Sequence, residues 1–187
     1  MRRHASARGL ARVPRAARGM TLIELMVTVT ILAVMLGLGV PSFRAFINSQ
    51  RVKSAATEMM TAVMIARSEA IKRNAAAASP IKVLAAADDA AGACPLSGGT
   101  WSAGWCVAQS PYNTAAATIH RQKSMEGIVL ATYTDARCTT TGNPVLEFNS
   151  SGRPAAPGCF KFSADSTSTT KCVAVDSTGI PSTITCP

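Results

Sequence analysis

The chain is poor in the side chains that enzymes use for proton transfer and metal binding. It holds two histidines, and only His120, which we interpret as a solvated loop residue, lies beyond the first nineteen positions. We find no nucleophile elbow, phosphate loop or metal-ligand spacing. Its six cysteines include no Cys-x-x-Cys pair, which disfavours a zinc site or a redox dithiol. Asp88 and Asp89 fit surface charge better than paired catalytic acids. We therefore expect no enzymatic activity, no cofactor and no metal site.

A basic excess is also missing from most of the chain. The formal net charge is +9, but six of the nineteen basic residues precede Gly19. From Ala75 onward, seven basic residues face seven acidic ones. A surface that reads phosphates normally carries a basic excess on one domain. The composition therefore disfavours nucleic-acid binding as the main activity.

The amino-terminal region combines arginines with a long apolar run. Residues 1–19 contain six arginines and no acid, and Glu24 is the only ionisable group between Met20 and Val40. Twenty-one helical residues span about 30 Å, the thickness of a bilayer's hydrocarbon core. A secretory signal has a shorter apolar stretch, and a mitochondrial presequence is amphipathic. The pattern predicts a membrane-spanning helix whose arginine-rich end stays in the cytoplasm.

Glu24 requires a partner, because a carboxylate within the apolar phase is costly. If the peptide bond after Gly19 is cut, Met20 presents a free α-amine within one helical turn of this acid. In an assembled fibre, the carboxylate of one subunit could pair with the terminal amine of its neighbour. The alternative is a side chain that merely reaches the membrane interface.

The segment GMTLIELMVTVTILAVMLGLGVPSF resembles the class III signal of type IV pilins and type II secretion pseudopilins. This resemblance implies that a prepilin peptidase cuts after Gly19 and methylates Met20, where the family usually has phenylalanine. It makes Glu24 the fifth mature residue, an assembly residue. Pro41 matches the proline that kinks the pilin helix.

Beyond Pro41, apolar residues recur at three- and four-residue steps, which predicts an amphipathic helix to Asn74 with one buried stripe. The stripe residues are Val52, Ala56, Met59, Val63, Ala66 and Ala70. The stretch RVKSAATEMMTAVMIARSEAIKRN and the later WSAGWCV are similar to the GspH and FimT branch of pilin-like proteins. We therefore divide the chain into a leader (1–19), a transmembrane half-helix (20–40), an amphipathic half-helix (41–74) and a head domain (75–187).

The head domain is rich in short runs of β-formers separated by glycine and proline. We expect an α+β pilin fold, in which one antiparallel sheet wraps the long amino-terminal helix. The expected strands are 81–84, 104–109, 127–133, 145–149, 159–162 and 172–175.

All six cysteines lie in the head domain. An even number on the translocated side of a membrane indicates disulfides. We expect neighbours along the chain to pair, namely Cys94 with Cys106, Cys138 with Cys159, and Cys172 with Cys186.

These features predict a minor pilin of the type IV pilus, with one membrane span, in the inner membrane and a periplasmic head. Expected partners are other major and minor pilins or pseudopilins, the prepilin peptidase and the inner-membrane assembly platform. Two alternatives stay open within the family, a type II secretion pseudopilin and a DNA-binding pilin for natural transformation. A third alternative is an anchored binding module that never polymerises.

The DNA-binding alternative is not favoured. DNA receptors of the FimT branch carry a Gly-Arg-x-Arg turn near the carboxyl end. The corresponding turn here is predicted at residues 179–182, Gly-Ile-Pro-Ser, without arginine. Arg153, after Gly152, is the one candidate DNA contact.

Overall fold

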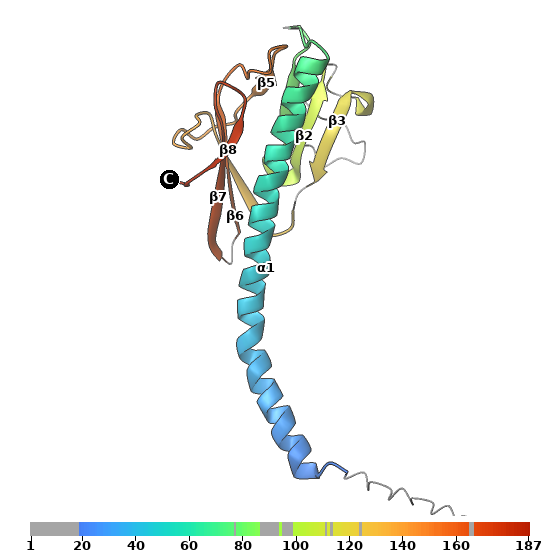
Figure 1. Ribbon diagram of the computed structural model, residues 1–187, viewed down its shortest axis with the longest axis vertical. Coiled ribbons are helices and arrows are strands. Elements are labelled where there is room, and N and C mark those ends of the chain that lie inside the picture. The colour runs from blue at the N-terminus through green and yellow to red at the C-terminus, as the bar shows by residue number, and fades with distance from the viewer. Residues whose placement is uncertain are drawn as a thin grey trace, which may run out of the picture. The chain divides into compact units, whose positions relative to one another are not determined.

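The computed structural model of this chain describes residues 19–187, apart from 77, 87–93, 95–98, 111, 113, 124 and 165–166. Two compact units make up the chain, Met1–Pro41 and Ser42–Pro187, and each is described by itself. Helix α1 (Leu22–Lys72) contributes to both units (Figure 1). Asp88, Asp89 and the arginines that precede Gly19 lie outside the described residues.

In the second unit, α1 presents one buried stripe to the rest of the protein. All six positions predicted from the periodicity are at most 3% exposed, and Ala55 and Ala62 join them. Most of the stripe is alanine, so the strands can approach the helix backbone closely. The predicted amphipathic packing of this half of the helix is confirmed.

Helix α1 ends at Lys72, two residues before the predicted end. Asn74 adopts a left-handed conformation with φ of 47°. The Asn74 N–H donates to the Ile71 carbonyl (3.1 Å), and the Ala75 N–H donates to the Ala70 carbonyl (2.9 Å). This is a Schellman motif, which satisfies the last carbonyls of a helix and redirects the chain. Ala75 is 3% exposed and continues the core.

Two four-stranded antiparallel sheets pack with α1. The first has the order β3-β2-β1-β5 and the second the order β4-β6-β7-β8. Figure 1 shows the carboxyl part of α1 lying across both sheets. The strands of the first sheet are β1 (Ile81–Ala85), β2 (Gly104–Gln109), β3 (Thr118–Lys123) and β5 (Leu146–Phe148). Those of the second are β4 (Ile128–Tyr133), β6 (Gly158–Ala164), β7 (Thr167–Val175) and β8 (Pro181–Ile184).

One hydrophobic core joins both sheets to the helix. Met59 of α1, Phe148 of β5 and Phe160 and Phe162 of β6 are fully buried in the same cluster. Two edge-to-face aromatic pairs contact β6. Trp105 of β2 pairs with Phe162 at 5.9 Å between ring centroids, and Trp101, just before β2, pairs with Phe160 at 5.1 Å. Trp101 belongs to η1 (Trp101–Ala103), a single 3-10 turn before β2. A second such turn, η2 (Ala115–Ala117), precedes β3.

The structure agrees with all six predicted strands and adds two that the sequence pattern did not indicate. β3 reads Thr-Ile-His-Arg-Gln-Lys and lacks an apolar run, and β8 begins at Pro181, which we had interpreted as a breaker. Both are edge strands. An edge strand tolerates proline and charge because one side makes no ladder bonds. These two strands give each sheet its fourth member. The head has two sheets where one was predicted.

Three disulfides connect the head, between Cys94 and Cys106, Cys138 and Cys159, and Cys172 and Cys186. These are the pairs expected from chain order. The first bridge lies in a small cluster with Ala108 and Tyr112. The other two lie together on the outer face of the second sheet. The bridges thus reinforce regions outside the main core.

Two glycine turns from different sheets pack against each other. Gly152 and Gly179 have φ of 73° and 78°, which disfavours other residues. A Cβ at Gly152 would lie 2.7 Å from Ile71 Cδ1 of α1, and one at Gly179 would collide with the Gly152 carbonyl. The Gly152 turn is therefore held between the end of α1 and the Gly179 turn.

Replacing Gly179 with alanine should destabilise the head more than replacing Gly127. Both glycines have left-handed φ, 78° and 74°. Only Gly179 faces a backbone atom, whereas at Gly127 the nearest atom to an added Cβ is Arg51 Nη1 at 3.9 Å. We expect Gly179→Ala to lower the free energy of unfolding by about 3 kcal/mol and Gly127→Ala by about 1–2 kcal/mol.

Urea unfolding of the detergent-solubilised chain, followed by tryptophan fluorescence, measures both values, since both tryptophans lie in the head. Equal losses for the two variants would contradict the close contact between the turns.

Candidate functional site

The amino end of α1 is organised by a reciprocal set of hydrogen bonds between Thr21 and Glu24. The Glu24 N–H donates to Thr21 Oγ1 (3.2 Å), and the Thr21 N–H donates to Glu24 Oε2 (2.9 Å). The Thr21 hydroxyl also donates to Oε2 (3.0 Å). This is a capping box, with threonine at the N-cap and glutamate three residues later. The carboxylate also lies at the positive end of the helix dipole.

The capping box gives Glu24 a partner within its own chain. Both hydrogen bonds from Thr21 reach Oε2, and among the described residues no donor reaches Oε1. An ionised carboxylate accepts at both oxygens, so Oε1 retains its capacity for a further donor. Sequence reasoning missed this role, although Thr-x-x-Glu before an apolar run is a readable helix-start pattern.

Gly19 and Met20 directly precede the capping box and are exposed. A Cβ built on Gly19 would find no described atom within 4 Å. The peptide bond between these residues is therefore open to a bulky partner on the side that the structure describes.

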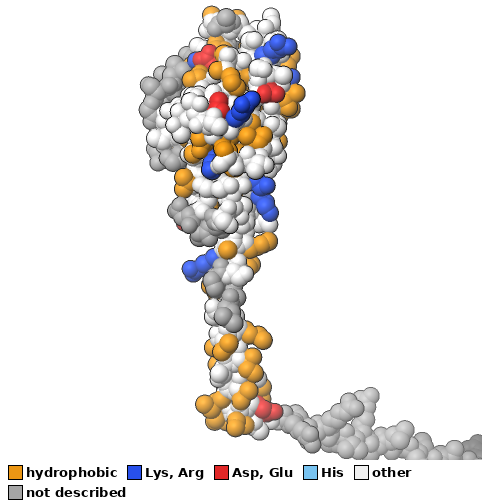
Figure 2. All heavy atoms as spheres, turned by 90° about the vertical axis from the view of Figure 1, so that its left-hand side faces the viewer, with side chains coloured by type: hydrophobic (Ala, Val, Ile, Leu, Met, Phe, Trp, Pro, Cys, Tyr) orange, Lys and Arg blue, Asp and Glu red, His pale blue; other side chains and the backbone are white. Residues whose placement is uncertain are grey.

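The helix that follows has an apolar surface in the first unit. Leu22, Ile23 and Met35 are 77%, 70% and 66% exposed, and hydrophobic side chains cover this part of the helix in Figure 2. α1 is long and apolar enough to cross a membrane.

Two threonines in the apolar segment make hydrogen bonds within the helix. Thr28 Oγ1 donates to the Leu25 carbonyl (2.9 Å), and Thr30 Oγ1 donates to the Met26 carbonyl (2.7 Å). Bonds of this type satisfy a hydroxyl without water. Both threonines are therefore compatible with an apolar environment.

The backbone of α1 is continuous through Pro41. The side chain of Pro41 lies outside the described residues, so its expected role in assembly stays a prediction.

Two family models match the chain. The model described as "Type II transport protein GspH" covers residues 55–179, and the model described as "Prokaryotic N-terminal methylation motif" covers residues 14–40. The first match spans much of the amphipathic half-helix and every strand of the two sheets except β8. The chain belongs to the GspH family. The second match contains Gly19 and the Thr21–Glu24 capping box.

Among solved structures, the chain is similar to the type IV minor pilin FimU of Pseudomonas aeruginosa (strain PAO1). The TM-score is 0.54 at 16% sequence identity, and the match covers 75% of this chain and 92% of the FimU chain. At this identity the likeness shows a shared fold. No curated protein matches the chain significantly. Together with the family match, the fold identifies a pilin-like member of the GspH family.

The two turns of this GspH-family chain that were considered for DNA contact lie next to each other, and Arg153 is their one basic side chain. Arg153 is exposed and follows the Gly152 turn, whose backbone is held by Asn149 Oδ1. The turn predicted at residues 179–182 lies earlier, because the Gly179 N–H closes onto the Asp176 carbonyl (3.0 Å) and Pro181 already belongs to β8. On the face shown in Figure 2, basic and acidic side chains are interspersed over the head.

The interpretation of His120 as a solvated loop residue is wrong. This residue lies in β3, and its Nε2 atom is buried without a hydrogen-bond partner among the described residues. The polar sequence of β3 concealed the strand. His120 lies opposite Val107 of β2 in the first sheet, and it is partly buried.

A second polar cluster lies on β1 and β5. Lys82 and Glu147 are cross-strand partners and form an ion pair. The Lys82 ammonium also lies 5.1 Å from the centroid of the Tyr112 ring. Burial, followed by the negative charge of Glu147, raises the pKa of Tyr112 to about 12, and its hydroxyl donates to the Pro80 carbonyl (2.8 Å). This arrangement keeps the phenol neutral and serves to hold the strands together.

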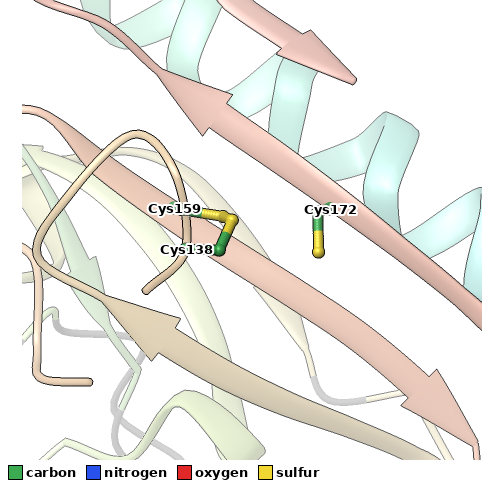
Figure 3. Close-up of side chains that lie close together, drawn as sticks. All are labelled: Cys138, Cys159 and Cys172. Atoms are coloured by element: carbon green, nitrogen blue, oxygen red, sulfur yellow. A yellow bond between two sulfur atoms is a disulfide. The ribbon is translucent and has the colours of Figure 1, made fainter. Parts of the chain in front are cut away.

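Three cysteine sulfurs, of Cys138, Cys159 and Cys172, lie within 4.8 Å of one another (Figure 3). Such a group can bind a soft metal as thiolates. Here all three sulfurs belong to disulfides. The group therefore does not fit a metal in the oxidised protein.

The loop that carries Cys138 is organised by Asp135. Its carboxylate accepts hydrogen bonds from the N–H of Thr140 (2.7 Å) and from the N–H (2.9 Å) and hydroxyl (2.8 Å) of Thr139. These donors, Thr140 first, lower the pKa of Asp135 below its ordinary value. Cys138 within this loop has φ of 60°, which a cysteine adopts only when its surroundings impose it.

We expect the head to lose stability in acid through Asp135. Its folded-state pKa lies below the unfolded value, so its contribution is fully present above about pH 5. The contribution disappears as pH falls through the lower folded pKa.

Asp135→Asn should therefore lower the melting temperature of the head at pH 6 and narrow the difference between variant and wild type near pH 2.5. Thermal melts by tryptophan fluorescence at several pH values measure this, with Glu126→Gln as a control for the lost charge. A constant difference across the whole range would contradict the role of the carboxylate.

Proposed function

We propose that this GspH-family chain is the precursor of a minor pilin that is cut between Gly19 and Met20, methylated at Met20 and inserted into a type IV pilus. The observation that carries the proposal is the capping box at Glu24, at the start of a helix whose first half has apolar side chains that the chain itself leaves exposed. A prepilin peptidase performs the cleavage and methylation. The family match and the FimU-like fold support a pilin or pseudopilin role; the place in the pilus, priming or tip, is the finer proposal.

Glu24 serves assembly through its two oxygens. Oε2 is held by Thr21, so the charge has a partner while the subunit is alone in the membrane. Oε1 accepts the α-ammonium of Met20 from a neighbouring subunit. A charge-assisted bond of this kind is stronger than a neutral one, and it gains further in a medium of low dielectric.

The order of segments follows from the same proposal. Residues 1–19 are the cytoplasmic leader, 20–40 cross the inner membrane, 41–74 form the amphipathic half-helix and 75–187 form the periplasmic head. The arginines before Gly19 hold the leader in the cytoplasm. The three disulfides suit an oxidising compartment, as the periplasm is.

An apolar groove on α1 gives neighbouring subunits a second contact. Its walls are threonine, methionine, isoleucine and serine side chains of α1 alone, namely Thr57, Met60, Thr61, Met64, Ile65 and Ser68. The occupant we propose is the apolar half-helix of an adjacent pilin, because that segment has the matching chemistry and is uncovered in this chain. The assembly platform in the inner membrane would bring the two together.

A second candidate function is that of a type II secretion pseudopilin. The description of the matching family model as a type II transport protein favours it. Both candidates share the leader, the Glu24 chemistry and the fold. They differ in the fibre that contains the subunit, which only a cellular phenotype distinguishes.

Glu24→Ala should abolish function without abolishing export. In a deletion strain, the wild-type chain should restore surface pili and twitching motility, and the variant should restore neither, because its helix lacks the group that accepts the neighbour's amine. The variant should still be cut and membrane-inserted, as mass spectrometry of the membrane fraction would show.

Normal pili with Glu24→Ala would support an anchored module in place of an assembly subunit. A deletion that stops secretion alone would favour the pseudopilin, and one that stops only DNA uptake would favour the DNA-binding pilin.

Gly19→Val should block processing, because the branched side chain fills space beside the bond to be cut. We expect precursor that keeps its nineteen leader residues and lacks the N-methyl group at Met20. Gly37→Val is the matched control, since Gly37 also has no described atom within 4 Å of an added Cβ. Intact-mass analysis distinguishes the precursor from the cleaved and methylated chain. Equal cleavage of Gly19→Val and Gly37→Val would contradict the proposed site.

A further inference from the structure

Three elements bring sulfur atoms together on the outer face of the second sheet. Cys138 lies in the loop after β4, Cys159 on β6 and Cys172 on β7, and these residues are at most 2% exposed. In the register of β6 with β7, Cys159 faces Ala174 and Cys172 faces Lys161. The two strand cysteines are therefore diagonal neighbours on one face. Figure 3 shows the Cys138–Cys159 disulfide with Cys172 beside it.

The bridge from Cys172 to Cys186 differs from its neighbour in its surroundings. Cys186 is only partly buried and follows the short edge strand β8. A hydrogen bond also holds this segment, because the Lys161 ammonium donates to the Pro187 carbonyl (3.4 Å). Whenever Cys186 is unpaired, Cys172 is a buried thiol within 4.8 Å of both sulfurs of an intact disulfide.

Burial opposes the thiolate form of Cys172, and one neighbour, Lys161, favours it. Lys161 lies directly opposite Cys172 in the strand register, so its cationic side chain shares a face with the sulfur. A neighbouring cation favours the thiolate, which is the form that attacks disulfides. Cys138 is the favoured leaving group, because its release frees a backbone held at φ of 60°.

We propose that Cys138, Cys159 and Cys172 form a disulfide-exchange centre, and that Cys186 fixes the native pairing by capturing Cys172. The Cys172 thiolate attacks Cys159 Sγ, the Cys159–Cys172 bond forms, and the Cys138–Cys159 bond breaks. Cys138 leaves as a thiolate with the electron pair. The number of thiols and disulfides is unchanged, so the step consumes neither oxidant nor reductant. The reverse step restores the native bridge. Closing the Cys172–Cys186 bridge then needs a two-electron oxidant of the small-molecule disulfide class: one half of that disulfide forms a mixed disulfide at Cys186 and the other half leaves as a thiolate. The Cys172 thiolate attacks Cys186 Sγ, and the second half of the small disulfide also leaves as a thiolate.

The Cys94–Cys106 disulfide is a built-in control. It lies in a different cluster, with Ala108 and Tyr112, and neither of its sulfurs belongs to the group of three. Freeing one of its cysteines should leave a thiol that has no disulfide to attack.

Tryptic peptides make the exchange directly visible. Arg137, Lys161 and Lys171 are the relevant cleavage sites, since the bond between Arg153 and Pro154 resists trypsin. Cys138 and Cys159 thus share the peptide 138–161, and Cys172 and Cys186 share the peptide 172–187. Native disulfides lie within peptides, whereas the exchanged bond joins 138–161 to 172–187.

The test uses the full chain with Cys186→Ser, isolated from membranes in detergent without added thiol, disulfide or other oxidant. Thiols are then blocked with a maleimide before digestion and mass spectrometry without reduction. We expect the joined peptides, together with maleimide on Cys138 as well as on Cys172. In the control variant Cys106→Ser, maleimide should be confined to Cys94. Maleimide on Cys172 alone in Cys186→Ser, with all 138–161 peptide internally bridged, would overturn the proposal.

A second measurement covers the case in which Cys186→Ser fails to fold. The wild-type chain is exposed to a low concentration of a dithiol reductant and sampled over time. We expect the link between 138–161 and 172–187 to precede any link to the peptide 83–121, which carries Cys94 and Cys106. Simultaneous appearance of all links would indicate general scrambling and would refute a defined exchange centre.

Discussion

Burial of the alanine-rich stripe of α1 is the interaction on which the head depends. Ala55, Ala62 and Ala66 are fully buried and offer almost no side chain of their own. The volume is filled instead by large side chains from the strands, such as Phe160 and Phe162. Because both sheets meet the same helix, neither could keep its inner face from water if the stripe were displaced. The helix therefore acts as the shared wall of one core.

The same helix has two chemically different halves. In the second unit its apolar residues form a stripe, and in the first unit they surround the axis. A helix that is apolar all round requires lipid or other helices as its surroundings. The hydroxyls of Thr28 and Thr30 donate to carbonyls of the same helix and so need no water. The Glu24 carboxylate accepts a hydrogen bond from Thr21 at one of its oxygens. The polar groups of the apolar half are thus arranged for an environment without water.

Local sequence predicted most of the fold, and the exceptions have physical causes. β2 was predicted to the residue, because Trp105 and Val107 alternate with smaller residues after a glycine. β3 and β8 were not predicted, because their sequences resemble those of loops. Edge strands are often polar, and they tolerate a proline such as Pro181. The division into two sheets follows from long-range pairing, such as β1 with β5, that no local pattern reveals.

The candidate site was predictable only in part. Gly19 and Glu24 stand out by composition, as a lone acid after a glycine in an apolar run. The hydrogen bonds between Thr21 and Glu24 follow a spacing that is visible in the sequence, yet only the structure shows that both Thr21 donors reach the same carboxylate oxygen, Oε2. The proximity of Cys138, Cys159 and Cys172 could not be inferred from separations of 21 and 13 residues. It depends on the register of β6 with β7.

The contact between the Gly152 and Gly179 turns has a consequence for how the head unfolds. The two hydrogen-bond ladders are separate, so each sheet could in principle open by itself. The turns, however, place the β5 end of one sheet against the β8 end of the other and against Ile71 of α1. Opening either sheet at this corner uncovers backbone of the other. The two ladders are thereby coupled, and we expect the head to lose its structure in a single cooperative transition.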